Sequence, residues 1–169
     1  MGRMTWCCIA LFYIAGCGAK NSYLITVEPQ GTKIVIGKFT PSVLISDSSF
    51  LWYSHNYDAF TPDSASIAFL STAAKDIRFV VVGGTWCSDT KRELPKFFKV
   101  VSLAHLPESN IDLYGVDRSK KSKEGLTEKY GINRVPTFIL LFEGKEVGRI
   151  VESTREGMEF DLVGLLRKK

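Results

Sequence analysis

The chain is poor in the residues that bind metals or form internal disulfides. Its 169 residues include only two histidines and four cysteines. His55 and His105 lie far apart and match no metal-ligand spacing, so we expect no metal site and no other cofactor. The formal net charge of +4 is too small to imply a strongly basic surface, so we expect no nucleic-acid partner.

Long apolar runs are also missing. The longest, residues 5–16, follows Arg3 and is shorter than the roughly 20 residues that a membrane-spanning helix needs. A positive start followed by a short apolar run is typical of a signal peptide. The run closes with Ile14-Ala15-Gly16-Cys17, which resembles the bacterial lipobox, where small residues precede a cysteine that is diacylated.

The lipobox resemblance implies a lipid anchor. Residues 1–16 would be a lipoprotein signal peptide, Cys17 the lipidated N-terminus, and residues 17–22 a tether. Two acyl chains hold a protein firmly on a membrane, so we expect the protein in the cell envelope, facing the periplasm. The alternatives are an ordinary signal peptide cut after Ala15 or Gly16, and an uncleaved anchor.

These assignments leave one free thiol in the folded part of the chain. Cys7 and Cys8 would leave with the signal peptide, and Cys17 would carry lipid. Cys87 then has no partner for an internal disulfide. It is either buried and inert, or reactive toward other molecules.

The first half of the folded part predicts a hairpin followed by helical segments. Residues 23–27 and 33–39 are rich in β-formers and are separated by a turn with Pro and Gly. The aromatic-rich stretch 50–60 predicts a short helix or irregular segment packed on the core. A helix over residues 61–75 follows, with Thr61 and Asp63 marking its cap and Pro62 at its first helical position.

The second half predicts an alternation of strands and helices. Its elements are a strand at 79–82 buried on both faces, an amphipathic helix at 88–103, a strand at 111–116, a polar helix at 123–130, strands at 137–142 and 146–151, and a helix at 156–166. The order strand, helix, strand, helix, strand, strand, helix is that of a mixed α/β domain.

Four features of this second half together resemble the thioredoxin superfamily. An apolar strand leads into Trp86 and Cys87, the cysteine opens a helix, Pro95 interrupts that helix, and Val135-Pro136-Thr137 opens the later hairpin. The resemblance implies an α/β, thioredoxin-like fold with a central mixed β-sheet flanked by helices. Residues 79–169 would form its core, and residues 23–78 an N-terminal β-hairpin extension and first helix.

The motif around Cys87 narrows the resemblance. Gly84-Thr85-Trp86-Cys87-Ser88-Asp89-Thr90 is similar to the Trp-Cys-x-Asp-Ser/Thr motif of exported thioredoxin-family proteins of Bacteroidota-type bacteria, which often carry a lipobox. In the wider family, the residue matching Pro136 is a cis-proline that faces the reactive cysteine. The resemblance therefore implies a peptide-docking edge at Val135.

Physical chemistry gives separate reasons to consider Cys87. A thiol in the first turn of a helix faces unsatisfied N–H groups and the positive end of the helix dipole, which favour the thiolate. Trp86 would shield one side of the thiol and offer a flat apolar surface to a substrate. Asp89 would oppose thiolate formation if its carboxylate points inward, so the net effect has no predictable sign.

The motif departs from a dithiol thioredoxin at Thr90, which stands where the second, resolving cysteine would be. Thr90 can donate a hydrogen bond to the Cys87 sulfur but cannot release a mixed disulfide. The sequence therefore predicts a monothiol that is resolved by an external thiol, supplied by a small molecule or by a partner protein.

Two functions remain open at this point. The first is a membrane-anchored monothiol thiol–disulfide oxidoreductase, in which Cys87 acts with Thr90, and Trp86, Val135 and Pro136 bind substrate. Its partners would be exported proteins with thiols or disulfides, or small-molecule thiols. The second is a non-catalytic module that binds peptides or proteins, with Cys87 incidental. A peroxidase ranks third, because Gly84 stands where related peroxidases have a threonine.

Overall fold

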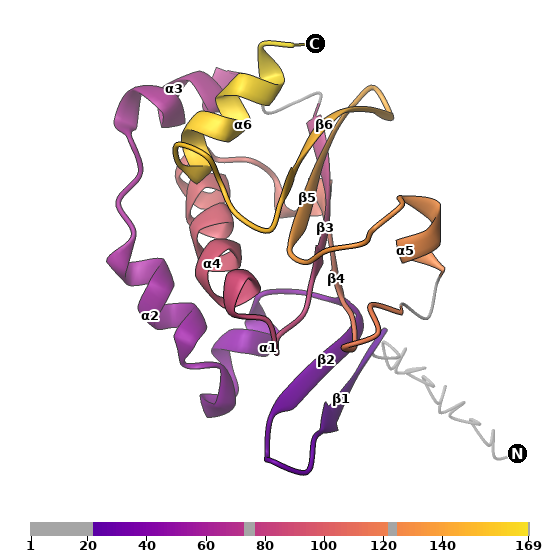
Figure 1. The fold of residues 1–169 in the computed structure, drawn as a ribbon. Coiled ribbons are helices and arrows are strands. Elements are labelled where there is room, and N and C mark those ends of the chain that lie inside the picture. The colour runs from indigo at the N-terminus through magenta and orange to yellow at the C-terminus, as the bar shows by residue number, and fades with distance from the viewer. Residues whose placement is uncertain (1–21, 73–76, 122–124, 169) are drawn as a thin grey trace, which may run out of the picture.

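The computed structural model describes residues 22–72, 77–121 and 125–168. The predicted signal peptide and the predicted lipidation at Cys17 lie outside these residues. The described chain forms a six-stranded sheet in the order β1-β2-β4-β3-β5-β6, flanked by helices (Figure 1). Its strands are β1 (Tyr23–Val27), β2 (Lys33–Phe39), β3 (Ile77–Gly83), β4 (Ile111–Gly115), β5 (Thr137–Phe142) and β6 (Lys145–Val151).

The strand directions confirm the predicted thioredoxin-like fold. Strands β3 and β4 are parallel, while β5 runs antiparallel to β3 and β6 antiparallel to β5. The hairpin of β1 and β2 extends the same sheet, because β2 pairs antiparallel with β4 from Gly37↔Gly115 to Phe39↔Leu113. A side chain at Gly115 would collide with the Val35 carbonyl, so glycine is required where these two strands meet.

The helices lie around this sheet. They are α1 (Ser42–Ile45), α2 (Trp52–Ala59), α3 (Ser64–Thr72), α4 (Ser88–Leu103), α5 (Leu126–Lys129) and α6 (Met158–Leu166), with 3-10 turns η1 (Ser48–Phe50) and η2 (Glu108–Asn110). Helices α2 and α6 both pack against α4, which links β3 to β4 (Figure 1). No helix within the described ranges combines the length and apolar character needed to cross a bilayer.

The two faces of the sheet bury different cores. Successive residues of β3 point to opposite faces, so Phe79 and Val81 join one core and Val80 and Val82 the other. The larger core contains the aromatic side chains Phe39, Phe50, Tyr53, Phe79, Phe97, Phe98 and Phe138. The smaller core is entirely aliphatic and consists of Val80, Val82, Val116, Leu126, Ile132, Val135 and Ile139.

Most predicted elements have the expected position, and two need correction. Strands β1, β2 and β5 and helix α4 match their predicted bounds. Helix α3 begins at Ser64, not at Pro62, because Asp63 is its cap and accepts a hydrogen bond from the Ser66 N–H at 2.7 Å. Helix α5 is also shorter than predicted, because it begins only after Gly125, which has a left-handed φ of 61°.

Candidate functional site

Cys87 lies at the junction between β3 and α4. It is the N-cap of α4, with an extended backbone at φ −85° and ψ 131°. Its N–H donates to the Gly84 carbonyl at 2.8 Å, and its own carbonyl accepts from the Lys91 N–H at 3.0 Å. These bonds form the tight turn that leaves the strand and the first turn of the helix. The thiol is partly exposed and packs against the smaller core.

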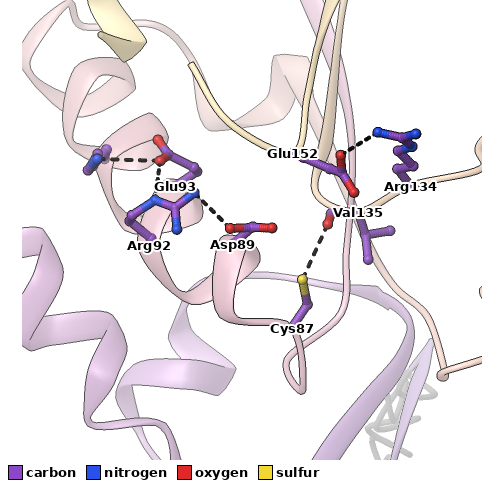
Figure 2. Close-up of polar contacts among 8 residues, drawn as sticks. Cys87, Asp89, Arg92, Glu93, Arg134, Val135 and Glu152 are labelled. Carbon is purple, nitrogen blue, oxygen red and sulfur yellow. Dashed lines mark hydrogen bonds and ion pairs between the residues drawn. The ribbon is translucent and has the colours of Figure 1, made fainter. Parts of the chain in front are cut away.

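The Cys87 sulfur points toward Val135, in the segment just before β5. Its Sγ donates a hydrogen bond to the Val135 carbonyl at 3.3 Å, as Figure 2 shows. It makes no capping hydrogen bond to the first turn of α4, which differs from the expectation that the helix N–H groups face the thiol. The Val135–Pro136 peptide bond is cis. The structure therefore brings Cys87, Val135 and Pro136 together, from segments that lie 48 residues apart.

Thr90 has a different partner from the one predicted. Its side chain is 1% exposed, and its Oγ1 accepts a hydrogen bond from the Gly84 N–H at 3.2 Å. The threonine therefore faces the end of β3, and the hydrogen bond of the Cys87 sulfur goes to Val135 instead. Thr90 ties the first turn of α4 to the end of the strand, and in this way holds the turn that carries Cys87.

Trp86 is fixed by three contacts. Its Nε1 donates to the Val116 carbonyl at 3.0 Å, which anchors the edge of the ring. The indole lies so close to Gly84 that a Cβ there would approach it to 2.6 Å, so no larger residue fits at that position. The Arg118 guanidinium lies 5.2 Å from the ring centroid, in cation–π contact. Arg118 thus covers part of the flat surface that we expected to receive a substrate.

Arg118 in turn connects the site to the β1–β2 hairpin. Its Nη2 donates to Glu28 Oε2 at 2.9 Å, and its Nε donates to the other carboxylate oxygen. Glu28 begins the turn after β1, 90 residues away in the sequence. The hydrogen bond from Arg118 lowers the pKa of Glu28 below its ordinary value of 4.5. The hairpin that precedes the predicted core therefore supports the tryptophan beside the thiol.

The acidic side chains at the start of α4 are all paired with cations. Arg92 bridges two of them, with Nη2 at 2.7 Å from Asp89 Oδ1 and Nε at 2.7 Å from Glu93 Oε1 (Figure 2). Lys96 also approaches Glu93, at 3.4 Å. Asp89 is therefore neutralised on its own helix, and the repulsion that we considered between Asp89 and a thiolate at Cys87 is weakened.

A second ion pair lies beside Val135. Arg134 Nη1 contacts Glu152 Oε2 at 2.8 Å, as Figure 2 shows. Glu152 also donates its backbone N–H to the Pro136 carbonyl at 2.8 Å. The segment before β5 is thereby fastened to the end of β6. Sequence reasoning missed Arg118, Glu28, Arg134 and Glu152, and only the charge of each residue could have drawn attention to them.

The chemistry that the described residues of this site can supply is that of a single thiol. Cys87 is the single cysteine within the described ranges, so no second sulfur of that part of the chain can attack a disulfide formed on it. His55 and His105 are both exposed, and no group of three metal-ligating side chains comes together among the described residues. A thiol that forms a mixed disulfide is released when another thiol attacks that bond, and the described residues contain no second cysteine to do so.

Comparisons with known proteins describe the fold only. No protein-family model matches the chain, and no curated protein matches it. Among solved structures, a protein of unknown function from Pseudomonas aeruginosa is 15% identical, with a TM-score of 0.50 over 75% of this chain and 83% of that one. Fasciola hepatica thioredoxin is 20% identical, with a TM-score of 0.40 over 60% of this chain and 88% of its own.

A third solved structure, mitochondrial thioredoxin 3 from Saccharomyces cerevisiae, is 17% identical, with a TM-score of 0.39. The match covers 68% of this chain and 99% of the yeast protein. Because these sequence identities are low, none of these structural similarities shows that this chain has the activity of the similar protein. The strand order and pairing on their own give the conclusion that the chain has a thioredoxin-like fold, extended by an N-terminal hairpin.

Proposed function

We propose that this protein is a monothiol thiol–disulfide exchange protein that acts through Cys87. Its substrates would be thiols or disulfides of exported proteins or small molecules. The observation that carries the proposal is the placement of Cys87, which is partly exposed at the N-cap of α4 with its sulfur 3.3 Å from the Val135 carbonyl. An inert structural cysteine would be expected to be buried in one of the two cores.

The proposed reaction begins with the loss of the S–H proton from Cys87 to solvent, which also ends the hydrogen bond to Val135. The thiolate attacks one sulfur of a substrate disulfide, a new S–S bond forms to Cys87, and the other substrate sulfur leaves as a thiolate. An external thiolate then attacks the Cys87 sulfur and releases the substrate as a thiol. That attack leaves a disulfide between Cys87 and the external thiol. A second external thiolate attacks the external sulfur of this bond, so an external disulfide forms, Cys87 leaves as a thiolate, and two external thiols are oxidised for each disulfide reduced.

The neighbours of Cys87 have supporting roles in this proposal. Thr90 holds the turn that presents the thiol, through its hydrogen bond with Gly84. Trp86 forms one wall, in an orientation fixed by Val116 and Arg118. The substrate chain would lie along Val135 and Pro136, where the carbonyl released by Cys87 becomes available to accept a hydrogen bond.

The experiment is to trap the mixed disulfide. The folded full-length protein is mixed with a peptide disulfide, and the adduct is located by mass-spectrometric peptide mapping, which separates Cys87 from the other cysteines. We expect an adduct on Cys87 that an external thiol releases and that a Cys87→Ala variant lacks. An unmodified Cys87 in the folded protein would contradict the proposal.

A second candidate is a binding module without thiol chemistry. It is favoured by Thr90 at the position of a resolving cysteine and by the engagement of the Val135 carbonyl with the cysteine itself. Under this reading, the Cys87→Ala variant captures the same partner proteins as the natural chain. If the protein instead exchanges disulfides, its partner proteins are captured through a disulfide to Cys87, and the Cys87→Ala variant does not capture them.

We also propose that the protein is anchored in the cell envelope through lipid on Cys17. The support is the sequence Ile14-Ala15-Gly16-Cys17 at the end of a short apolar run. A Cys17→Ser variant should move from the membrane fraction to the soluble fraction, and mass spectrometry of the natural protein should find acyl chains on Cys17. A natural protein without acyl chains would contradict the anchor and leave the exchange reaction unaffected.

A further inference from the structure

A polar hollow of about 240 Å³ lies beside the turn that carries Cys87. We call it the hairpin hollow. One wall is the turn between β1 and β2 with Thr32, together with Lys33 at the start of β2, and a second is formed by Ser49 and Phe50 of η1 and Trp52 of α2. The third wall is formed by Thr85 and by Lys91 in the first turns of α4. The N-terminal hairpin and the cysteine turn therefore share one surface depression.

The hollow is fixed rigidly to the reactive turn. Thr85 lies two residues before Cys87, and its buried Oγ1 donates to the Lys33 carbonyl at 3.1 Å and accepts from the Val35 N–H at 3.2 Å. The Lys91 N–H donates to the Cys87 carbonyl at 3.0 Å. Two lining residues are thus tied to the hairpin and to the backbone of Cys87, so the hollow has a defined position relative to the turn that carries the thiol.

Lys91 contributes a positive charge to the set of residues that line the hollow. The other lysine, Lys33, is neutralised by Asp47 at 2.7 Å. The hydrogen bond from Lys33 lowers the pKa of Asp47 to about 2, so this pair persists at all ordinary pH values. Within the described ranges, no carboxylate pairs with Lys91 Nζ. Glu28 forms an ion pair with Arg118, and Asp89 forms one with Arg92.

We infer that the hairpin hollow binds a carboxylate that the disulfide substrate carries near its reactive sulfur. The inference rests on the proposed exchange reaction and names its substrate class. Lys91 would supply the charge, and the hydroxyls of Thr32 and Ser49 would supply further donors. The volume lies below the range of about 300–1,000 Å³ for whole-ligand pockets, so the hollow suits one acidic side chain of a larger substrate.

The experiment compares two peptide disulfides that differ only by Glu or Gln beside the cysteine. The rate of adduct formation on Cys87 of the full chain is measured for both peptides at low salt by peptide mapping. We expect the acidic peptide to react about two- to fivefold faster, as for one partly exposed ion pair. The preference should disappear in Lys91→Gln and at high salt. It should persist in Lys145→Gln, which removes an exposed lysine at the start of β6.

The outcomes separate this inference from the proposed function. Equal rates for the two peptides in the natural chain would overturn the hollow as a carboxylate site while leaving Cys87 reactive. A preference that survives in Lys91→Gln would also overturn it. If neither peptide reacts with folded Cys87, both the exchange reaction and its substrate class are rejected. Circular dichroism of Lys91→Gln verifies that the variant is folded.

Discussion

The two faces of the sheet divide stability and chemistry between them. The face covered by α2, α4 and α6 buries an aromatic core in which Phe97 contacts the rings of Phe79, Phe98 and Phe138 at 5.0 to 5.2 Å. The opposite face buries a small aliphatic core, and Trp86 and Cys87 pack against this one. Cys87 therefore lies on the face with the smaller core, whose buried residues include no aromatic side chain.

The largest loss of stability should follow from a substitution in the aromatic core. Phe97 is 0% exposed, so Phe97→Ala removes a ring that three other rings contact and leaves a cavity. We expect the free energy of unfolding to fall by about 3–5 kcal/mol in urea denaturation. The control is Phe160→Ala, which truncates a ring that is 43% exposed and should cost no more than about 0.5 kcal/mol. Similar losses in both variants would contradict the comparison.

A smaller loss is expected in the aliphatic core. Ile139 is also 0% exposed, but Ile139→Ala removes a smaller side chain than Phe97→Ala does, so it should cost about 2–3 kcal/mol. Because Cys87 packs against this core, Ile139→Ala should also change the adduct rate at Cys87 more than Phe97→Ala does. Both quantities are measured under conditions in which each variant is folded. An adduct rate at Cys87 that changes only in Phe97→Ala would contradict the assignment of Cys87 to the face with the aliphatic core.

Replacing either of two glycines by alanine should change the stability, in opposite directions at the two positions. A Cβ at Gly84 would meet the Trp86 indole at 2.6 Å, so Gly84→Ala must displace the ring, and we expect a loss of about 1–2 kcal/mol. Gly164 lies inside α6 with no atom within 4 Å of an added Cβ, so Gly164→Ala should stabilise by about 0.5–1 kcal/mol. Denaturation midpoints test both. Equal shifts would show that Trp86 is not held against Gly84.

The smallest effect concerns the support of Trp86 by the hairpin. Since Arg118 lowers the pKa of Glu28, their pair contributes stability above about pH 4.5 and loses it as pH falls through the lowered pKa. The indole N–H signal of Trp86 should therefore shift below pH 4.5 in NMR spectra of the natural chain. In Glu28→Gln that acid transition should be absent. A transition that is unchanged in this variant would separate Trp86 from the hairpin.

Local patterns in the sequence predicted much of the fold. Helix α4 has a strong helical periodicity, strands β1, β2 and β5 are runs of β-forming residues bounded by clear turn residues, and the bounds of all four were predicted correctly. The start of α3 was not, because Pro62 and Asp63 both suit the beginning of a helix, and only the hydrogen bond from Ser66 shows which residue is the cap.

Only the part of the candidate site that lies close to Cys87 in the sequence could be predicted. The position of Cys87 at the start of α4 follows from the sequence nearby. The contact of Arg118 with Glu28 joins residues 90 apart, and it depends on the pairing of β2 with β4, which no local pattern reveals. Thr90 was placed on the wrong partner for a similar reason, since the sequence does not show which way its side chain turns in the first turn of α4.

The most direct test of the account compares Cys87 in the folded and unfolded chain. A small neutral disulfide is added to the protein with and without a denaturing concentration of urea at the same pH, and adduct formation at Cys87 is followed by peptide mapping. We expect folded Cys87 to react at least as fast as unfolded Cys87, because the fold presents the thiol to substrate. A thiol that reacts only after unfolding would contradict exchange chemistry at this site.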